Sequence, residues 1–254
     1  EGNDRNEKHV VSREVPLLPM SMDDLLLPGQ TTTLVFKEGR FFDLLEDVQD
    51  NHHGILGTIL MGKDGLESVI PLCAVTDYEV QAGFRGKVTA TVTLTCVGRV
   101  SLEQLVQVQP TLRGRVGPEW NDRYVDDNKG LARRLVADLE TTVQTSWPDL
   151  VATYQNIRNS VRSVLISTNQ DGESSFADLS STTSAAINLQ AASWAVVSLL
   201  GQDPNARYSL FTSKDAVKRL RDGERAVWME RLERATASAT EETSASSGSE
   251  TSFE

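Results

Sequence analysis

Residues 86–100 alternate between two kinds of side chain, and this alternation constrains the fold more strongly than any other feature of the sequence. Aliphatic residues and Cys96 occupy the even positions from Val88 onward, while threonines occupy the odd positions from Thr89 to Thr95. A period of two is typical of a β-strand with one buried face. A threonine face opposite an aliphatic face therefore predicts a half-buried strand of an antiparallel sheet.

Other predicted strands lie close to this one in the sequence. The run from Val15 to Met20 contains two prolines, which lack the amide proton that an inner strand donates, so we expect an edge strand there. A hairpin turn is expected at residues 63–65, Lys-Asp-Gly, and a helix over residues 39–49, where apolar side chains have helical spacing. Three further strands are predicted, at residues 31–36, 54–61 and 68–75.

From about Asp127 the period of the apolar residues changes to 3.6, which predicts helices. The dipeptide Trp147-Pro148 ends the first of them, and Ser213 is the expected N-cap of the last. Two more helices are predicted between these points, at residues 150–165 and 185–200. Strands clustered first and helices clustered afterwards favour the α+β class.

This order divides the chain into four parts. The ends are polar and unpatterned, so we expect a flexible leader and a disordered acidic, serine-rich tail. The expected limits are a leader at 1–13, a β-rich part at 14–125, a helical part at 126–236 with a polar spacer at 167–184, and a tail at 237–254.

The net charge of −11 and the pI of about 4.8 restrict the possible partners. A nucleic-acid binder needs a basic face that displaces counterions from phosphate, so we expect no nucleic-acid partner. An acidic chain is equally unsuited to an anionic membrane surface, and no run approaches the roughly twenty apolar residues that span a bilayer. The acidity is best explained by solubility.

Cys73 and Cys96 are the only cysteines, and both lie among apolar and β-branched residues. Two buried thiols are favoured over a disulfide, and two cysteines alone cannot complete a tetrahedral zinc site. The sequence begins at Glu1 rather than at methionine, which leads us to expect a fragment or a processed chain. The interior of a plastid or other organelle is the favoured compartment, with the cytoplasm as the alternative.

The order of several short motifs resembles the LON N-terminal domain, the substrate-binding domain of Lon proteases. Residues 15–20 (Val-Pro-Leu-Leu-Pro-Met) and 27–29 (Leu-Pro-Gly), followed by a strand and a Phe/Leu helix, are similar to the opening of that family. Residues 94–100 are similar to its strand ending in a Gly-Arg corner. Residues 192–200 and 208–220 are similar to the helices that end it.

The resemblance covers residues 14–235 and implies a PUA-like antiparallel β-barrel followed by a small helical bundle. It also implies a module that binds proteins or peptides without a cofactor or catalysis of its own, since the ATPase and Ser–Lys protease domains of the full proteases are missing. One departure concerns residues 76–88, which are shorter than the family's usual two-strand insert. A loop of the binding face is therefore expected to be trimmed.

We found no convincing catalytic motif. Residues 57–63 match the spacing of a phosphate-binding loop, but Asp64 replaces the required hydroxyl, and the segment between the glycines favours a strand. His52 and His53 are neighbours in an expected loop and point apart, so a solvated loop is favoured over a metal site with Asp47 or Asp50. The sequence also contains no Gly-x-Ser-x-Gly elbow.

Two basic spots and four tryptophans complete the candidates. Residues 113–115 (Arg-Gly-Arg) and 133–134 (Arg-Arg) are the densest basic spots, and the first is interpreted either as a solvated loop or as a site for an acidic partner. Three tryptophans, Trp147, Trp194 and Trp228, lie at helical spacing among aliphatic residues and are expected in the core. Trp120 lies between polar residues and is the candidate for an exposed anchor.

The favoured function is a non-catalytic module that holds extended or unfolded protein segments along an exposed barrel edge and in the cleft between barrel and helices. Such a module could act as an adaptor in proteolysis or protein quality control. Methionines adapt to varied partners and aromatic side chains anchor them. The candidate contacts are Met20, Met22, Phe41, Phe42, Met61 and Trp120, with core packing as the alternative for the phenylalanines. The rival functions are a structural or assembly subunit of a larger complex and, less favoured, a hydrolase.

Overall fold

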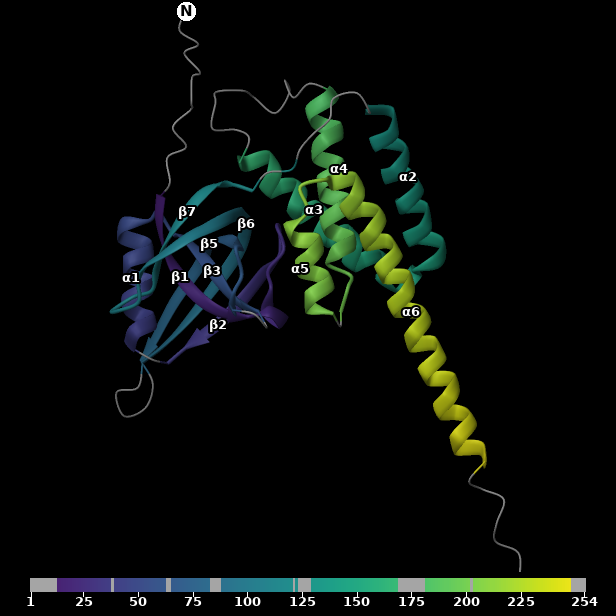
Figure 1. The fold of residues 1–254 in the computed structure, drawn as a ribbon, viewed down its shortest axis with the longest axis horizontal. Coiled ribbons are helices and arrows are strands. Elements are labelled where there is room, and N and C mark those ends of the chain that lie inside the picture. The colour runs from purple at the N-terminus through teal and green to yellow at the C-terminus, as the bar shows by residue number, and fades with distance from the viewer. Residues whose placement is uncertain are drawn as a thin grey trace, which may run out of the picture.

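The computed structural model describes residues 13–37, 39–62, 65–82, 88–120, 122, 129–168, 181–201 and 203–247. The expected leader up to residue 12, most of the polar spacer and the last seven residues of the expected tail lie outside this description. Figure 1 shows a strand-rich part, which contains helix α1, and beside it a part made of helices. The predicted α+β class, with strands first and helices afterwards, is confirmed.

Seven strands form one mainly antiparallel sheet that closes on itself. In the order β1, β7, β6, β5, β3, each strand pairs with the next, and β3 pairs again with β1. β2 pairs with the first half of β6, and the short β4 forms a hairpin with β3. The bounds are β1 (Arg13–Ser21), β2 (Thr31–Phe36), β3 (Ile55–Gly62), β4 (Gly65–Leu66), β5 (Val69–Ala82), β6 (Val88–Gln107) and β7 (Arg113–Glu119).

The prediction that the proline-containing strand β1 lies at an edge is wrong. Its first half pairs antiparallel with β7, from Arg13 to Pro16, and its second half pairs parallel with β3, from Leu17 to Ser21. The strand thus changes its main partner along its length and completes the ring. Pro16 is tolerated because its missing amide falls where one ladder gives way to the other, whereas Pro19 lies within the ladder with β3.

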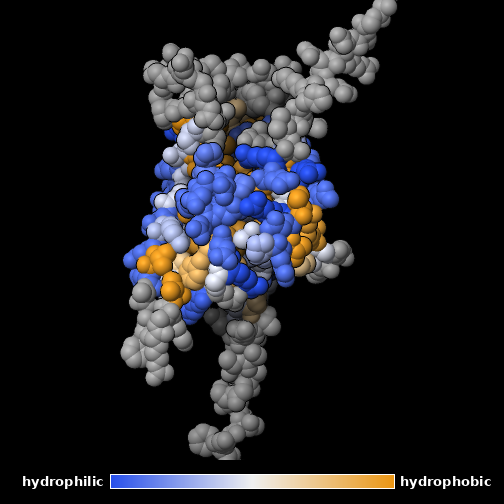
Figure 2. All heavy atoms as spheres, turned by 90° about the vertical axis from the view of Figure 1, so that its left-hand side faces the viewer, coloured by the Kyte–Doolittle hydropathy of each residue, from blue (hydrophilic) through white to orange (hydrophobic). Residues whose placement is uncertain are grey.

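The alternation in residues 86–100 separates a buried face of β6 from a partly exposed one, as predicted. Ala90, Val92, Leu94 and Cys96 are completely buried in the barrel, and the intervening threonines are partly exposed on its outer surface. Helix α1 (Gly39–Asn51) closes this part of the barrel with a buried face of Leu44, Leu45 and Val48. The outer face of the barrel that is turned away from the helices is mostly hydrophilic, with hydrophobic residues in small separate areas (Figure 2).

The helical part begins after β7. Its elements are α2 (Lys129–Ser146), a 3₁₀ turn η4 (Pro148–Leu150), α3 (Val151–Thr168), α4 (Ser181–Val197), α5 (Pro204–Thr212) and α6 (Ala216–Ser247). The helix break at Trp147-Pro148 is as predicted. The last helix differs from its prediction at both ends. Asp215, rather than Ser213, accepts hydrogen bonds from the first amides of α6, and α6 continues to Ser247 through a segment expected to be disordered from residue 237.

Barrel and helices share one hydrophobic core. Leu25, Leu27, Leu60 and Val69 of the strand-rich part belong to the same buried cluster as the inner faces of the helices. Trp147 and Trp194 lie in that cluster as predicted, whereas the Trp228 side chain is 46% exposed, so its expected burial is wrong. Two further buried clusters lie within the strand-rich part alone, so the two parts are joined by one cluster of the three.

A buried ion cluster also joins the two parts. Asp122, between β7 and α2, accepts hydrogen bonds from Arg99 of β6 at 2.7 Å and from Arg219 of α6 at 2.5 and 2.8 Å. Arg219 lies 3.6 Å from the ring of Trp194 and also donates to Ser193. Burial lowers the pKa of Arg99 to about 10. Because a buried charge requires a partner, Asp122 fixes the barrel against α6.

The remaining sequence predictions concern small groups of polar residues. Cys73 and Cys96 are free, buried and directly opposite each other on β5 and β6, as expected of two buried thiols. The segment 113–115 is part of β7 and not a solvated loop. The Arg113 side chain forms an ion pair with Asp47 at 2.6 Å. His52 lies 3.8 Å from Asp47, and burial lowers its pKa.

Candidate functional site

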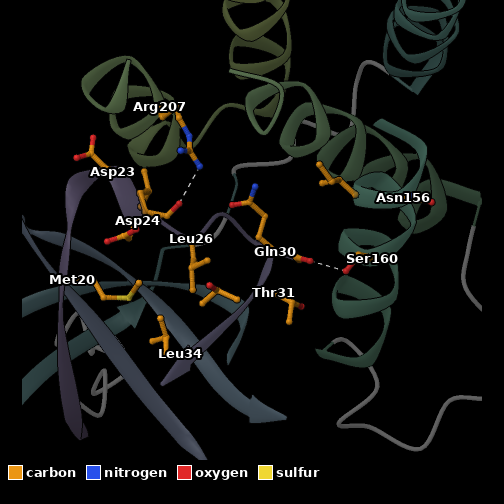
Figure 3. A pocket seen from close by; sticks show the side chains of 14 residues that line it. Met20, Asp23, Asp24, Leu26, Gln30, Thr31, Leu34, Asn156, Ser160 and Arg207 are labelled. Carbon is orange, nitrogen blue, oxygen red and sulfur yellow. Dashed lines mark hydrogen bonds between the residues drawn. The ribbon is translucent and has the colours of Figure 1, made fainter. Parts of the chain in front are cut away.

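A cleft of about 510 Å³ lies between the strand-rich part and helices α3 and α5. Figure 3 shows Met20, Leu26 and Leu34 on its barrel side and Asn156 and Ser160 of α3 opposite them. The 3₁₀ turn η1 (Met22–Asp24) and the loop after it form the wall between these sides.

The cleft follows the edge of β2 rather than one of its faces. Thr31 points to the outside of the sheet and Thr32 and Leu34 point inward, yet all three line the cleft. Only β6 pairs with β2 among the described residues. The other edge of β2 therefore offers backbone amides and carbonyls to the cleft, which is the arrangement that lets an extended segment add to a sheet.

At the end of the cleft beside α5 lies a charged side chain that has one hydrogen-bond donor without an acceptor among the described residues. Arg207 of α5 donates one hydrogen bond, at 3.1 Å, to the carbonyl oxygen of Leu25, and burial lowers its pKa. Its Nε is buried and has no hydrogen-bond partner within the described residues. A buried donor of this kind favours binding of a ligand that brings an oxygen acceptor, such as a peptide carbonyl.

The turn at residues 27–29 holds the two walls of the cleft together. Gly29 has a φ of +81°, and a Cβ atom there would lie 2.5–2.7 Å from the backbone and side chain of Val161. Ser160 donates a 2.6 Å hydrogen bond to the carbonyl oxygen of Gly29 (Figure 3). Only glycine can adopt this backbone conformation and leave room for α3. The width of the cleft is therefore set by direct contact between the turn and the helix.

Of the six residues predicted as contacts, only Met20 lines the cleft. Met22 packs on the shared core beside it, and Phe41 and Phe42 pack on the barrel interior, where Phe41 stacks on Phe36 at 4.7 Å. Met61 is 62% exposed on β3, next to the hairpin with β4. The six residues therefore do not form one surface.

Trp120 is not the freely exposed anchor that its polar neighbours indicated. Its ring packs on the shared core, and its Nε1 donates a 2.8 Å hydrogen bond to the carbonyl oxygen of Thr212. The ammonium group of Lys214 lies 3.6 Å from the centre of the ring. Trp120 thus joins the end of β7 to the connection between α5 and α6, and its role is structural.

Sequence reasoning missed most of the cleft. Its polar lining comes from residues with no local signal, such as Gln30, Asn156 and Arg207, which are far apart in the sequence. The one usable signal was the Leu-Pro-Gly turn at residues 27–29, which marks a close approach of backbone. The sequence did not indicate that α3 is the element that packs against this turn.

The described residues contain no group of three or more histidine, cysteine or carboxylate side chains that could hold a metal ion. No helix in the described part of the chain is long and apolar enough to cross a membrane. The described lining of the cleft offers hydrogen bonding along a strand edge and contact with aliphatic side chains.

Two solved structures are similar to the chain over most of its length. The Lon N-terminal domain protein from Xanthomonas campestris is 17% identical and covers 82% of this chain and 95% of its own, with a TM-score of 0.49. The N-terminal domain of the Mycobacterium avium complex Lon protease is 14% identical and covers 85% and 98%, with a TM-score of 0.48. Both are Lon N-terminal domains, the family that the ordered motifs resemble.

No protein-family model matches the chain, and no curated protein matches it in sequence.

Proposed function

We propose that this protein is a non-catalytic module that binds extended segments of other proteins in the cleft between the barrel and helices α3 and α5. The segment would add to the free edge of β2, and its side chains would contact Met20, Leu34 and Ile157. Backbone pairing supplies affinity without a sequence requirement, and the aliphatic lining adds a loose preference for apolar side chains. The proposal extends to an adaptor role in proteolysis or protein quality control.

The observation that carries the proposal is the combination of an unpaired strand edge with a cleft that runs along it. Thr31 and Thr32 line the cleft from opposite faces of β2, so a bound strand has room beside the edge. The buried Nε of Arg207, which has no partner among the described residues, supports a ligand with carbonyl groups. The barrel face turned away from the helices is mostly hydrophilic, which favours the cleft over that face (Figure 2).

The test uses a pair of asparagines on α3. Asn156 lines the cleft and is exposed, so Asn156→Trp fills the cleft without removing a core contact. Asn159 is also exposed on α3 and does not line the cleft, which makes Asn159→Trp the matched control. Binding of a fluorescently labelled, permanently unfolded protein, such as reduced and carboxymethylated lactalbumin, is measured by fluorescence anisotropy.

We expect Asn156→Trp to weaken binding at least tenfold and Asn159→Trp to leave the Kd within a factor of two. Equal binding by the two variants, or no binding by the unaltered chain, would contradict the proposal. Pull-down with crosslinking addresses the rival function. Many unfolded clients support the binding module, whereas a single stoichiometric partner retained by Asn156→Trp indicates a structural subunit of a complex.

A further inference from the structure

A second and more enclosed cavity, of about 650 Å³, lies within the helical part between α2, α4 and the start of α6. It is separate from the cleft described above, with which it shares no lining residue. Its volume is within the range of about 300–1,000 Å³ that is typical of small-molecule sites.

The floor of this cavity is aliphatic. Side chains from three helices contribute to it, and the described lining contains no aromatic ring. The apolar members are Leu131, Ala132, Ala186, Leu189, Ala216 and Val217. Small residues on facing helices leave a volume that no side chain of the described lining fills. An aliphatic chain is the ligand part that matches such a surface, since burial of its CH₂ groups removes apolar area from water.

Positive charge is concentrated at one side of the cavity. Lys214, Lys218 and Arg221 all line it, on a chain whose net charge is −11. Lys214 lies against the Trp120 ring, whereas Lys218 and Arg221 are exposed and have no ion-pair partner among the described residues. Two unpaired cations at the mouth of an apolar cavity favour an anionic group on the ligand.

The two carboxylates of the lining do not neutralise these cations. Asp122 is bound by Arg99 and Arg219, and Asp215 accepts the amides of Val217 and Lys218 at 2.9 Å. Because Asp215 already binds these amides, the charge available to a ligand comes from the side chains and not from the helix end. Asp122 is thus compensated by two arginines, and Lys218 and Arg221 have no ion-pair partner in the described part of the chain.

We propose that this cavity binds an amphiphile with an anionic head group and an unbranched aliphatic chain. The chain lies on the floor formed by α2 and α4, and the head group contacts Lys218 and Arg221. A carboxylate and a phosphate monoester share this chemistry, so decanoate and decyl phosphate distinguish the two head groups. The proposal is independent of peptide binding in the cleft.

The experiment titrates the full chain with decanoate, decyl phosphate and 1-decanol by isothermal titration calorimetry, below the micelle concentration. Lys218→Glu/Arg221→Glu reverses the charge at the mouth, and Arg225→Glu, exposed on the same helix outside the cavity, is its control. Ala186→Phe fills the cavity, and Ala235→Phe, on an exposed part of α6, is the control for that change.

We expect one saturable site for at least one of the two anions. The double charge reversal should weaken it at least about tenfold, because it replaces charge-assisted hydrogen bonds to the head group by repulsion. Ala186→Phe should abolish it, while both controls bind within a factor of two. Equal binding of 1-decanol, unchanged binding by the charge-reversal variant, or no saturable binding of either anion would overturn the proposal. Binding of unfolded protein in the cleft should be unaffected by Ala186→Phe, which separates this site from the proposed function.

Discussion

At the scale of single residues, Asp122 connects the barrel to the helical part. It is 4% exposed and is the shared partner of two buried arginines that come from β6 and α6. The Gly-Arg corner at residues 98–99 was visible in the sequence only as part of a family-like motif. The structure shows why an arginine stands there: the Arg99 side chain passes from the barrel into the helical part and also donates to the carbonyl oxygen of Ser213.

Replacing Asp122 by asparagine should therefore destabilise the whole chain. Asp122→Asn leaves the charges of Arg99 and Arg219 buried without a counter-ion, and breaking a buried pair in this way costs about 3–5 kcal/mol. Urea unfolding followed by tryptophan fluorescence measures the loss. The control is Asp149→Asn, which removes an exposed ion pair with Arg231 and should leave the urea midpoint nearly unchanged. Similar midpoints for the two variants would show that the cluster contributes little.

Tyr208 provides a second prediction at this scale, which concerns pH. Burial raises the pKa of the Tyr208 phenol to about 12, and its hydroxyl contacts the backbone of Val69. Between pH 10 and 12 the unfolded chain ionises this group while the folded chain keeps it neutral, so its contribution to stability is complete below pH 10 and is lost as the pH rises.

Tyr208→Phe removes this pH dependence. The difference in unfolding free energy between the unaltered chain and Tyr208→Phe should shrink from pH 10 to pH 12, measured by urea titrations at each pH. The lowered pKa of Arg99 acts in the opposite direction, but it is present in both proteins and cancels in the difference. A difference that stays constant over this range would show that Tyr208 ionises equally in both states.

At the scale of elements, the sequence predicted those strands and helices that have strong local patterns. The alternation on β6, the strand at residues 31–36 and the helix break at Trp147-Pro148 agree with the structure because each depends on neighbouring residues. The interior position of β1 could not be predicted, because it depends on pairing with β7, about a hundred residues away. The same holds for the cleft, whose walls meet only in the folded chain.

Helix α6 was mispredicted for a different reason. Its first part is buried against α4, but every residue from Leu232 to Ser238 is exposed, and the helix continues to Ser247. An isolated helical segment of this length is only marginally stable in water. The polar composition beyond residue 237 was interpreted as disorder, although α6 continues through it to Ser247.

We therefore predict two levels of protection within α6. Amide hydrogen exchange followed by mass spectrometry should show strong protection from Arg219 to Val227 and weak protection beyond about Ala235, because the outer part can open without disturbing the core. The inner part serves as the control within the same helix. Strong protection of the outer part in a monomeric sample would contradict this expectation.

At the scale of the whole molecule, the shared core implies a single cooperative unit. Leu25 and Val69 of the strand-rich part and Trp194 of α4 belong to one buried cluster, while two further clusters lie within the strand-rich part alone. A barrel fragment ending after Trp120 would expose those of its residues that belong to the shared cluster. We therefore expect the two parts to unfold together.

Unfolding should accordingly follow one transition. Tryptophan fluorescence reports mainly on the helical part, which contains Trp147, Trp194 and Trp228, and circular dichroism near 215 nm includes the strands. Their urea midpoints should coincide within experimental error, and residues 13–120 expressed alone should lack a cooperative transition. Separate midpoints, or a cooperative transition of the fragment, would show that the barrel folds independently.

The position of β1 has a consequence for the order in which the protein is made. Arg13 and Glu14 leave the ribosome early, but their partners Val116 and Arg115 are synthesised about a hundred residues later. The ring therefore cannot close during synthesis of the other strands, and its first strand must wait with an unpaired edge. Contacts this distant in sequence slow folding. During that interval β1 is the segment most in need of protection from aggregation.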